Sequence, residues 1–289
     1  MLSYQHIYHA GNFADVQKHA LLAQVMKSFA AKPVPMAAID MHAGRGVYRL
    51  TDVEAEKNRE FDNGITRLWM RRHDMPPVLK PYLDILSALN ESRQMLAYPG
   101  SAHIARKLMR PTDKLTAIER HPGEFAKLRR EMAGQPQTEL LQDDSLKLLM
   151  DRIPLPGRRG IVICDPSYEI KTEYAEIARI ITQAWKKWPQ GCYFIWYPIM
   201  DAGGHETLLA GLRKNGVNNI LISEIMLAAA PEQHFRMHGS GIAIINPPWP
   251  IAVAQSVTDA IIPCLHGATG RVFWLDDYHV DPDTGRMQK

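Results

Sequence analysis

Short apolar runs recur along the chain, each bounded by turn residues and separated from the next by a longer polar or periodic stretch. Such runs are typical of buried strands, whereas apolar residues three and four positions apart are typical of helices. Strands that alternate with helices predict an α/β fold with a mostly parallel sheet, covered by helices on both faces. Seven strands are predicted, at 36–42, 115–119, 139–142, 160–164, 192–197, 220–228 and 241–245, with the clearest helices at 124–132, 173–188 and 205–215.

One interval is too long for a single crossover helix, because Asp40 and Glu119, which close the first two strands, are 79 positions apart. Within it, 60–72 and 78–90 predict two helices, with two consecutive prolines between them as a stop and restart. We interpret this interval as a helical insertion. It divides the chain into an amino-terminal motif with the first strand (1–46), the insertion (47–97) and the remainder of the same domain (98–289).

The pattern resumes at Gly100 and Ser101, where Ser101 is suited to N-cap a helix over 102–109. Ser101 precedes Glu119 by 18 residues, the helix-plus-strand distance expected between a phosphate-type loop and an acidic ribose ligand. The insertion therefore separates a nucleotide-binding loop from its own helix.

Composition excludes several classes of protein. A chain of 289 residues with 46% hydrophobic and 22% charged residues is typical of a globular protein. The three cysteines are far apart and form no CxxC pair, so neither a disulfide framework nor a zinc knuckle is indicated. No window of 18 apolar residues occurs, and the first residues lack the pattern of a signal peptide. We therefore expect a cytoplasmic protein with no membrane partner.

The net charge of +3 is small, but positions 45–159 carry 21 Lys and Arg against 16 Asp and Glu. This basic excess favours a phosphate-binding surface about as strongly as it favours ordinary solvated helix faces. Within the insertion, Arg67, Arg71 and Arg72 are the hypothesised phosphate contacts.

A glycine-rich turn follows the first predicted strand. Asp40 is followed by His42, Gly44 and Gly46, and two glycines this close allow the backbone to approach a ligand. The third glycine or alanine of a dinucleotide fingerprint is absent, since Arg49 occupies its position, so a dehydrogenase is not predicted. A strand-end acid before a Gly-x-Gly turn is also how S-adenosylmethionine methyltransferases hold their cofactor. The alternative is a connection that binds nothing.

Carboxylates also close the next two predicted strands. Glu119 is suited to accept both ribose hydroxyls of a nucleoside, and Asp144 with the Ser145 amide is suited to read an adenine edge. Each residue alone has a simple alternative, a surface carboxylate or an ordinary helix cap. Together they predict a nucleoside site along one edge of the sheet.

Asp165, Pro166, Ser167 and Tyr168 follow the fourth strand and resemble the Asp-Pro-Pro-Tyr motif of amino-methyltransferases. An exocyclic base amine is a poor nucleophile because its lone pair is delocalised into the ring. The Asp165 carboxylate and Pro166 carbonyl are suited to accept its two N–H bonds, and Tyr168 to stack on a flipped-out base. Ser167 replaces the second proline, and a plain turn after a buried strand is the alternative.

A second sequence, Asn246-Pro247-Pro248-Trp249, formally matches the same pattern after the last strand. Strand order argues against it, because the strand that follows the Glu119 and Asp144 strands should supply the catalytic loop. That strand ends at Asp165.

Polar residues crowd the amino terminus, namely Tyr4, His6, His9, Asp15, Lys18 and His19. Asp15 and His19 lie one helical turn apart, but no second acidic or cysteine ligand accompanies them, so no metal site is predicted. A polar helix face that contacts cofactor or nucleic acid is the simpler interpretation.

The chain resembles the RlmJ family of 23S ribosomal RNA adenine-N6 methyltransferases over nearly its whole length, including the insertion. The resemblance is carried by the first nineteen residues, by 40–46 and 98–101, by Glu119-x-His121-Pro122 and by 246–249. It implies a Rossmann-like class I fold with a seven-stranded sheet, S-adenosylmethionine as cofactor and 23S rRNA, free or partly assembled, as partner of a monomer.

The resemblance also implies roles for individual residues. Asp165 is the catalytic residue, with Pro166 and Tyr168 beside it. The RNA contacts are Tyr4, His6 and Lys18. The cofactor contacts are His19, His42, Gly44, Gly46, Ser101, Glu119, Asp144, Ser145 and Asp165; Ser145 replaces a usual glycine.

The leading hypothesis is N6 methylation of one adenine in 23S rRNA. Two alternatives are DNA adenine-N6 methylation by the same site and a non-catalytic nucleic-acid-binding protein on the same fold. Some family members have been linked to the use of external DNA as a nutrient.

Overall fold

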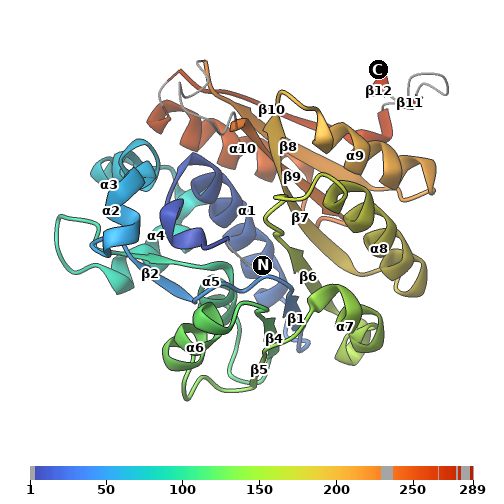
Figure 1. Cartoon of the computed structure of the whole chain (residues 1–289), viewed down its shortest axis with the longest axis horizontal. Coiled ribbons are helices and arrows are strands. Elements are labelled where there is room, and N and C mark those ends of the chain that lie inside the picture. The colour runs from blue at the N-terminus through green and yellow to red at the C-terminus, as the bar shows by residue number, and fades with distance from the viewer. Residues whose placement is uncertain (1–3, 229–236, 266, 278, 281–286, 289) are drawn as a thin grey trace.

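A computed structural model describes residues 4–228, 237–265, 267–277, 279–280 and 287–288 (Figure 1). Its centre is an eight-stranded sheet of strand order β10-β8-β9-β7-β6-β1-β4-β5. The strands are β1 (Ala37–Asp40), β4 (Lys114–Ile118), β5 (Thr138–Leu141), β6 (Gly160–Cys164), β7 (Cys192–Met200), β8 (Ile220–Met226), β9 (Met237–Ile245) and β10 (Thr269–Trp274). A separate short pair joins β11 (His279–Val280) to β12 (Met287–Gln288).

Strand directions agree with the predicted, mostly parallel α/β sheet. Strands β5, β4, β1, β6 and β7 are parallel neighbours. Strand β9 runs against both β7 and β8, and β10 runs against β8. The α/β fold class is confirmed, but the prediction of seven strands was one too few, because β10 was missed. The carboxyl ends of β1, β4, β5 and β6 therefore meet at one edge, which we call the carboxyl edge; we call the opposite one the amino edge.

Helices cover both faces of the sheet, each over its own apolar core. Helices α1 and α10 pack together on one face with α5, while α7, α8 and α9 pack on the other (Figure 1). The helices of the main domain are α1 (Phe13–Ala30), α5 (Ser101–Leu108), α6 (Pro122–Glu131), α7 (Ser145–Arg152), α8 (Glu173–Lys187), α9 (Gly204–Lys214) and α10 (Ile251–Ile261). None of the helices among the described residues has the length and apolar character to cross a membrane.

The residues predicted as an insertion begin and end in a small antiparallel pair, β2 (Val47–Arg49) with β3 (Ala97–Pro99). This pair brings the two sides of the interval together, and the Gly100 amide donates to the Gly46 carbonyl at 2.7 Å. The glycine loop thus lies beside α5, from which the sequence separates it. The division into 1–46, 47–97 and 98–289 stays a prediction.

The helix predicted over 60–72 is wrong, because the chain breaks at Gly64. A Cβ on Gly64 would lie 2.2 Å from the Gly11 carbonyl oxygen, so this position needs glycine for a close approach between two backbones. The elements here are α2 (Val53–Asn58), η2 (Glu60–Asn63), α3 (Ile65–Met70), η3 (Arg72–Asp74), η4 (Pro77–Leu79) and α4 (Lys80–Leu89).

Candidate active site at the carboxyl edge

Asp40, the last residue of β1, is completely buried. Its carboxylate accepts hydrogen bonds from the Ser101 hydroxyl at 2.7 Å and the His42 amide at 3.2 Å. Burial raises the pKa of Asp40 to about 7. The prediction that Ser101 is the N-cap of α5 is wrong, because Gly100 occupies that position. The Ser101 hydroxyl instead bonds to Asp40 and so connects α5 to the end of β1.

The loop after β1 has the shape that its glycines predict. Gly44 (φ +60°) and Gly46 (φ +85°) are both left-handed, and a Cβ on Gly44 would lie 2.1 Å from the Tyr48 hydroxyl. Glu119, just beyond β4, accepts from the Gly44 amide at 2.9 Å and from the His121 amide at 2.6 Å. Burial raises the pKa of Glu119. The loop and the carboxylate predicted to hold a nucleoside are thus in contact.

Asp144 lies at the end of the neighbouring strand β5 and N-caps α7, accepting from the Leu146 amide at 3.2 Å. Its other oxygen lies 3.7 Å from Arg120 and 3.8 Å from Lys147. Ser145 is buried as the first residue of α7. The capping role is real, and the predicted role in reading an adenine edge stays a prediction.

Asp165, directly after β6, is held from two sides. Its amide donates to Nδ1 of His42 at 3.2 Å, and its Oδ2 accepts from Lys18 Nζ of α1 at 2.6 Å. Burial lowers the pKa of His42 to about 4, so the ring is neutral and its Nδ1 can accept. The structure therefore joins three predicted site residues from three separate elements.

Lys18 is buried between two carboxylates, with its Nζ also 2.8 Å from Asp15 Oδ1. Burial alone would lower the pKa of Lys18, but the charges of Asp15 and Asp165 raise it above its ordinary value. The lysine is consequently charged, and its position beside Asp165 is electrostatically stabilised.

Tyr168 is only 6% exposed, and its ring stacks on Tyr174 at a centroid distance of 4.3 Å. Its hydroxyl donates to the Trp196 carbonyl at 2.9 Å, and its own backbone is left-handed at φ +53°. Pro166 is buried beside it. Little of the Tyr168 ring is free in this arrangement, so stacking on a base stays a prediction that requires the loop to open.

The amino-terminal residues divide into two groups. Tyr4 and His6 contact each other at 3.0 Å, and His6 Nε2 donates to Asp15 at 2.9 Å, beside Lys18. His19 instead faces the Tyr98 hydroxyl at 2.7 Å, and burial lowers its pKa to about 3. The proposed RNA contacts thus lie together near Asp165, whereas the predicted cofactor role of His19 stays a prediction.

Tyr48 and Trp196 were missed by sequence reasoning, and Asp15 was named without its contacts. Asp15 bridges Lys18 and His6, Tyr48 fills the space over Gly44, and the half-buried Trp196 lies with its ring centroid 5.5 Å from Lys18 Nζ. Asp15 and Lys18, three apart on one helix, had a detectable spacing. Trp196 gave no signal because it lies in an apolar strand, and Tyr48 gave none because nothing in its local sequence distinguishes it.

Asn246, the rival acceptor, lies at the amino edge, because β9 is antiparallel to β7 and ends where β7 begins. Its amide donates to the carbonyls of Pro189 and Gly191 at 2.7 and 2.8 Å. The decision against this motif on strand order agrees with its position.

All three insertion arginines have partners within the fold. Arg71 donates to the Pro263 carbonyl at 2.8 Å, and Arg72 packs on the Trp69 ring at 4.3 Å. Arg67 pairs with Asn63 on an exposed surface. Phosphate contact by these three arginines stays a prediction, and Arg67 is the one whose partner, Asn63, lies in the same exposed segment.

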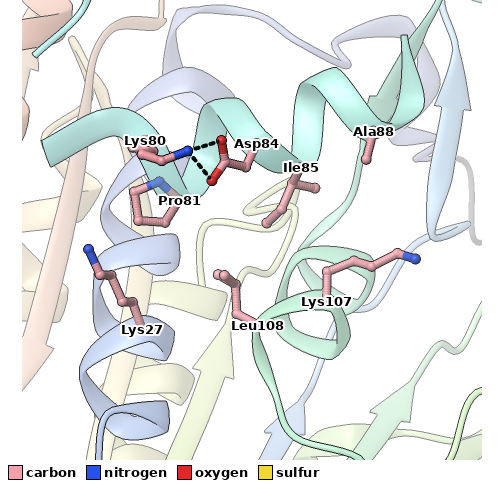
Figure 2. A pocket seen from close by; sticks show the side chains of 8 residues that line it. All are labelled: Lys27, Lys80, Pro81, Asp84, Ile85, Ala88, Lys107 and Leu108. Carbon is pink, nitrogen blue, oxygen red and sulfur yellow. Dashed lines mark hydrogen bonds and ion pairs between the residues drawn. The ribbon is translucent and has the colours of Figure 1, made fainter. Parts of the chain in front are cut away.

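A shallow hollow of about 520 Å³ lies between α1, α4 and α5 (Figure 2). Lys27, Lys80 and Lys107 contribute to it, and Lys80 pairs with Asp84. No residue of the predicted site lines it. The carboxyl edge is therefore distinguished by its chemistry rather than by this hollow.

Comparison with known proteins decides the family. Residues 33–275 match the family described as ribosomal RNA large subunit methyltransferase D, RlmJ. The chain belongs to the RlmJ family. Ribosomal RNA large subunit methyltransferase J of Escherichia coli K12 is 36% identical over 267 residues, which cover 92% of this chain and 93% of that protein. The Haemophilus influenzae protein of the same name is 35% identical with the same coverage.

The RlmJ family assignment extends to the structure. Protein LPL1258 of Legionella pneumophila superposes with a TM-score of 0.86 at 29% identity, covering 92% of this chain and 98% of that one. The predicted resemblance and the Rossmann-like methyltransferase fold class are thus confirmed. The site described above lies on the fold of a family of rRNA methyltransferases.

Proposed function

We propose that this protein uses S-adenosylmethionine to methylate the N6 amine of one adenine in large-subunit (23S) rRNA. The observation that carries the proposal is the row of carboxylates along four adjacent strands. Asp144, Glu119, Asp40 and Asp165 follow or end β5, β4, β1 and β6, which are neighbours in that order. The names of the relatives support rRNA as substrate.

The residues present fit the cofactor. A Cβ on Gly44 would collide with the Tyr48 hydroxyl at 2.1 Å, so the tight left-handed turn that would border the cofactor requires glycine at this position. Glu119 is fixed against this loop with an oxygen on each of two backbone amides, which leaves lone pairs for ribose hydroxyls. Asp144 and Ser145 would border the base. When bound, S-adenosylmethionine supplies an electrophilic methyl group.

Asp165 and Pro166 would orient the adenine amine. Lys18 occupies Oδ2 of Asp165, which directs the other carboxylate oxygen toward an incoming N–H donor. The Pro166 carbonyl would accept the second N–H, so that the amine lone pair points out of the ring plane. The neutral His42 ring accepts a hydrogen bond from the Asp165 amide and so fixes the backbone of Asp165. Positioning and electrostatics together supply the catalysis.

The decisive experiment compares Asp165→Ala with Asn246→Ala, its counterpart at the other edge, on unmodified 23S rRNA fragments. Mass mapping locates the methyl group, and calorimetry measures S-adenosylmethionine binding. We expect Asp165→Ala to lose at least about a hundredfold in turnover with a much smaller loss of cofactor affinity, and folded Asn246→Ala to keep its turnover. Undiminished transfer by Asp165→Ala would contradict the proposed site.

The same assay separates the alternatives. Methylation of adenine in DNA but not in RNA, with both substrates in competition, would assign the same site to DNA. Binding of nucleic acid without binding of S-adenosylmethionine would indicate a non-catalytic protein on this fold.

A further inference from the structure

The segment 4–12, which we call the arm, is fastened to the insertion by one carboxylate. Glu60 Oε1 accepts from His9 Nδ1 at 2.7 Å, and its Oε2 accepts from the Asn12 amide at 3.0 Å. The Asn12 side chain in turn N-caps α1 through the Asp15 amide at 3.0 Å. Both oxygens of Glu60 are thus committed to residues 48 and 51 positions away.

The backbones of the two segments also interlock. The Ile65 amide donates to the Gly11 carbonyl at 2.8 Å. Gly11 is left-handed at φ +78°, and a Cβ there would lie 2.7 Å from the Ile65 side chain. A Cβ on Gly64 would likewise strike Gly11 and Asn12. This contact fixes where the arm leaves α1, and Glu60 fixes the direction in which it continues.

From Glu60 the contacts lead to the catalytic carboxylate. His9 stacks on Tyr4 with centroids 5.9 Å apart and an interplanar angle of 12°. Tyr4 contacts His6, and His6 contacts Asp15. Asp15 and Asp165 then share Lys18. The position of Tyr4 therefore depends on His9 from one side and on His6 from the other.

A role in stability alone does not account for Glu60. Its side chain and that of His9 are each 34% exposed, and ion pairs so placed contribute little to the free energy of unfolding. Two charge-assisted hydrogen bonds to the arm instead restrict its conformation. Pre-ordering of a binding segment increases affinity, because the entropy of ordering is no longer lost on binding.

We propose that Glu60 is a positioning residue through which the insertion holds the arm, and with it Tyr4 and His6, ready for the RNA substrate. The inference deepens the proposed function and rests on it, because the RNA contacts of the arm belong to that proposal. The insertion is then the part of the chain that builds the substrate side of the site, opposite the glycine loop that serves the cofactor.

The test compares Glu60→Ala and Glu60→Gln with Asp62→Asn, a control in the same segment whose carboxylate contacts Arg59 rather than the arm. Glu60→Ala removes both acceptors, and Glu60→Gln keeps one. We expect the KM for RNA to rise about tenfold in Glu60→Ala and less in Glu60→Gln, with S-adenosylmethionine affinity unchanged. Asp62→Asn should match the unaltered protein.

A second readout follows the arm itself. Burial lowers the pKa of His9, but the hydrogen bond and charge of Glu60 outweigh it and raise that pKa above 6.5. NMR titration should therefore show a lower His9 pKa in Glu60→Gln than in Asp62→Asn. Hydrogen exchange of the arm amides should accelerate in Glu60→Ala, less in Glu60→Gln, and not in Asp62→Asn.

Three outcomes would overturn the inference: an unchanged KM for RNA in Glu60→Ala, an equal rise in Asp62→Asn, or a parallel loss of cofactor affinity and melting temperature. If the unaltered protein transferred no methyl group to RNA, the proposed function would fail separately. RNA affinity, which needs no methyl transfer, would then decide. A tenfold weaker complex with Glu60→Ala supports the inference, and an unchanged one rejects it.

Discussion

The chain contains the same four-residue pattern twice, and only one copy lies at the carboxyl edge, where the proposed function places the chemistry. Asp165-Pro166-Ser167-Tyr168 and Asn246-Pro247-Pro248-Trp249 each follow a buried strand, and each includes a left-handed residue at φ +53°. The first ends the parallel strand β6 and lies at the carboxyl edge. The second ends the antiparallel strand β9 and lies at the amino edge. Strand direction, rather than the motif, separates them.

The hydrogen bonds of Asn246 and Asp165 differ as well. The Asn246 side chain uses both amide hydrogens on backbone carbonyls and its oxygen on Asn219 at 3.0 Å. Asp165 is held through its backbone amide and one carboxylate oxygen, by residues from the loop after β1 and from α1. One copy is thus a fully bonded turn, whereas in the other the proposed function assigns the second oxygen of Asp165 to the substrate. A motif predicts chemistry only together with the elements that surround it.

Exchanging the two acceptor types tests this comparison most strongly. In Asp165→Asn, the neutral amide faces the Lys18 ammonium, so we expect kcat/KM on RNA to fall by about a hundredfold or more. In Asn246→Asp, a carboxylate faces the Pro189 and Gly191 carbonyls. We expect the free energy of unfolding to drop by about 2 kcal/mol with unchanged kcat/KM. Urea unfolding and steady-state kinetics measure both quantities.

The comparison would break if Asn246→Asp lost activity without losing stability. Equal kinetic loss in both variants would also contradict it, since the two loops lie at opposite edges of the sheet.

The sequence predicted the carboxyl edge better than it predicted the surroundings of that edge. The strands β1 and β6 are buried throughout and appear as apolar runs, and the carboxylates lie at or just after the ends of these strands and of the more polar β4 and β5. In contrast, β10 (Thr269–Trp274) begins with three exposed residues, so no apolar run marks it. The three-residue strands β2 and β3 are too short for periodicity to appear.

Contacts between distant segments could not be predicted. Lys18 and Asp165 are 147 positions apart, and Glu60 reaches the arm across about fifty residues. Such pairs depend on how helices pack, which local propensity does not determine. The wrong prediction of Ser101 as an N-cap has the same origin. The Ser101 hydroxyl bonds to Asp40, which is distant in sequence, and not to the backbone of its own helix.

The next prediction concerns Asp40, the buried carboxyl that ends β1 at the carboxyl edge. Folded Asp40 keeps its proton until about pH 7, while the unfolded chain releases it near pH 3.8. Between these values the folded state binds more protons, so raising the pH favours unfolding. Relative to Asp40→Asn, the protein should lose about 3 kcal/mol of unfolding free energy from pH 4.5 to 6.5.

Urea unfolding of both proteins at three pH values in that range measures the difference. Taking the difference is essential, because the neutral buried His19 and His42 change stability in the opposite direction over the same range. The asparagine retains the local bonds, since its oxygen can accept from the His42 amide and its amide can donate to the Ser101 hydroxyl. Parallel pH profiles would mean that Asp40 ionises normally.

The smallest effect distinguishes two left-handed glycines. Gly216 (φ +82°) precedes β8 near the amino edge, and a Cβ there meets no atom within 4 Å. Gly216→Ala should therefore cost only the backbone strain, about 1 kcal/mol, with unchanged cofactor binding. Gly44→Ala adds a collision with the Tyr48 hydroxyl at 2.1 Å, and moving the loop would weaken S-adenosylmethionine binding about tenfold.

The collision has a specific remedy that separates it from general damage to the loop. In Gly44→Ala with Tyr48→Phe, the hydroxyl is gone and the nearest Tyr48 atom that remains, Cζ, lies 3.4 Å from the new Cβ, an ordinary contact. Calorimetry should therefore show that the double variant regains part of the affinity lost by Gly44→Ala alone. If Tyr48→Phe failed to restore any binding, the left-handed backbone would be the whole cause. Gly44 and Gly216 would then differ in the segment that each one positions, and not in how tightly the atoms around each one are packed.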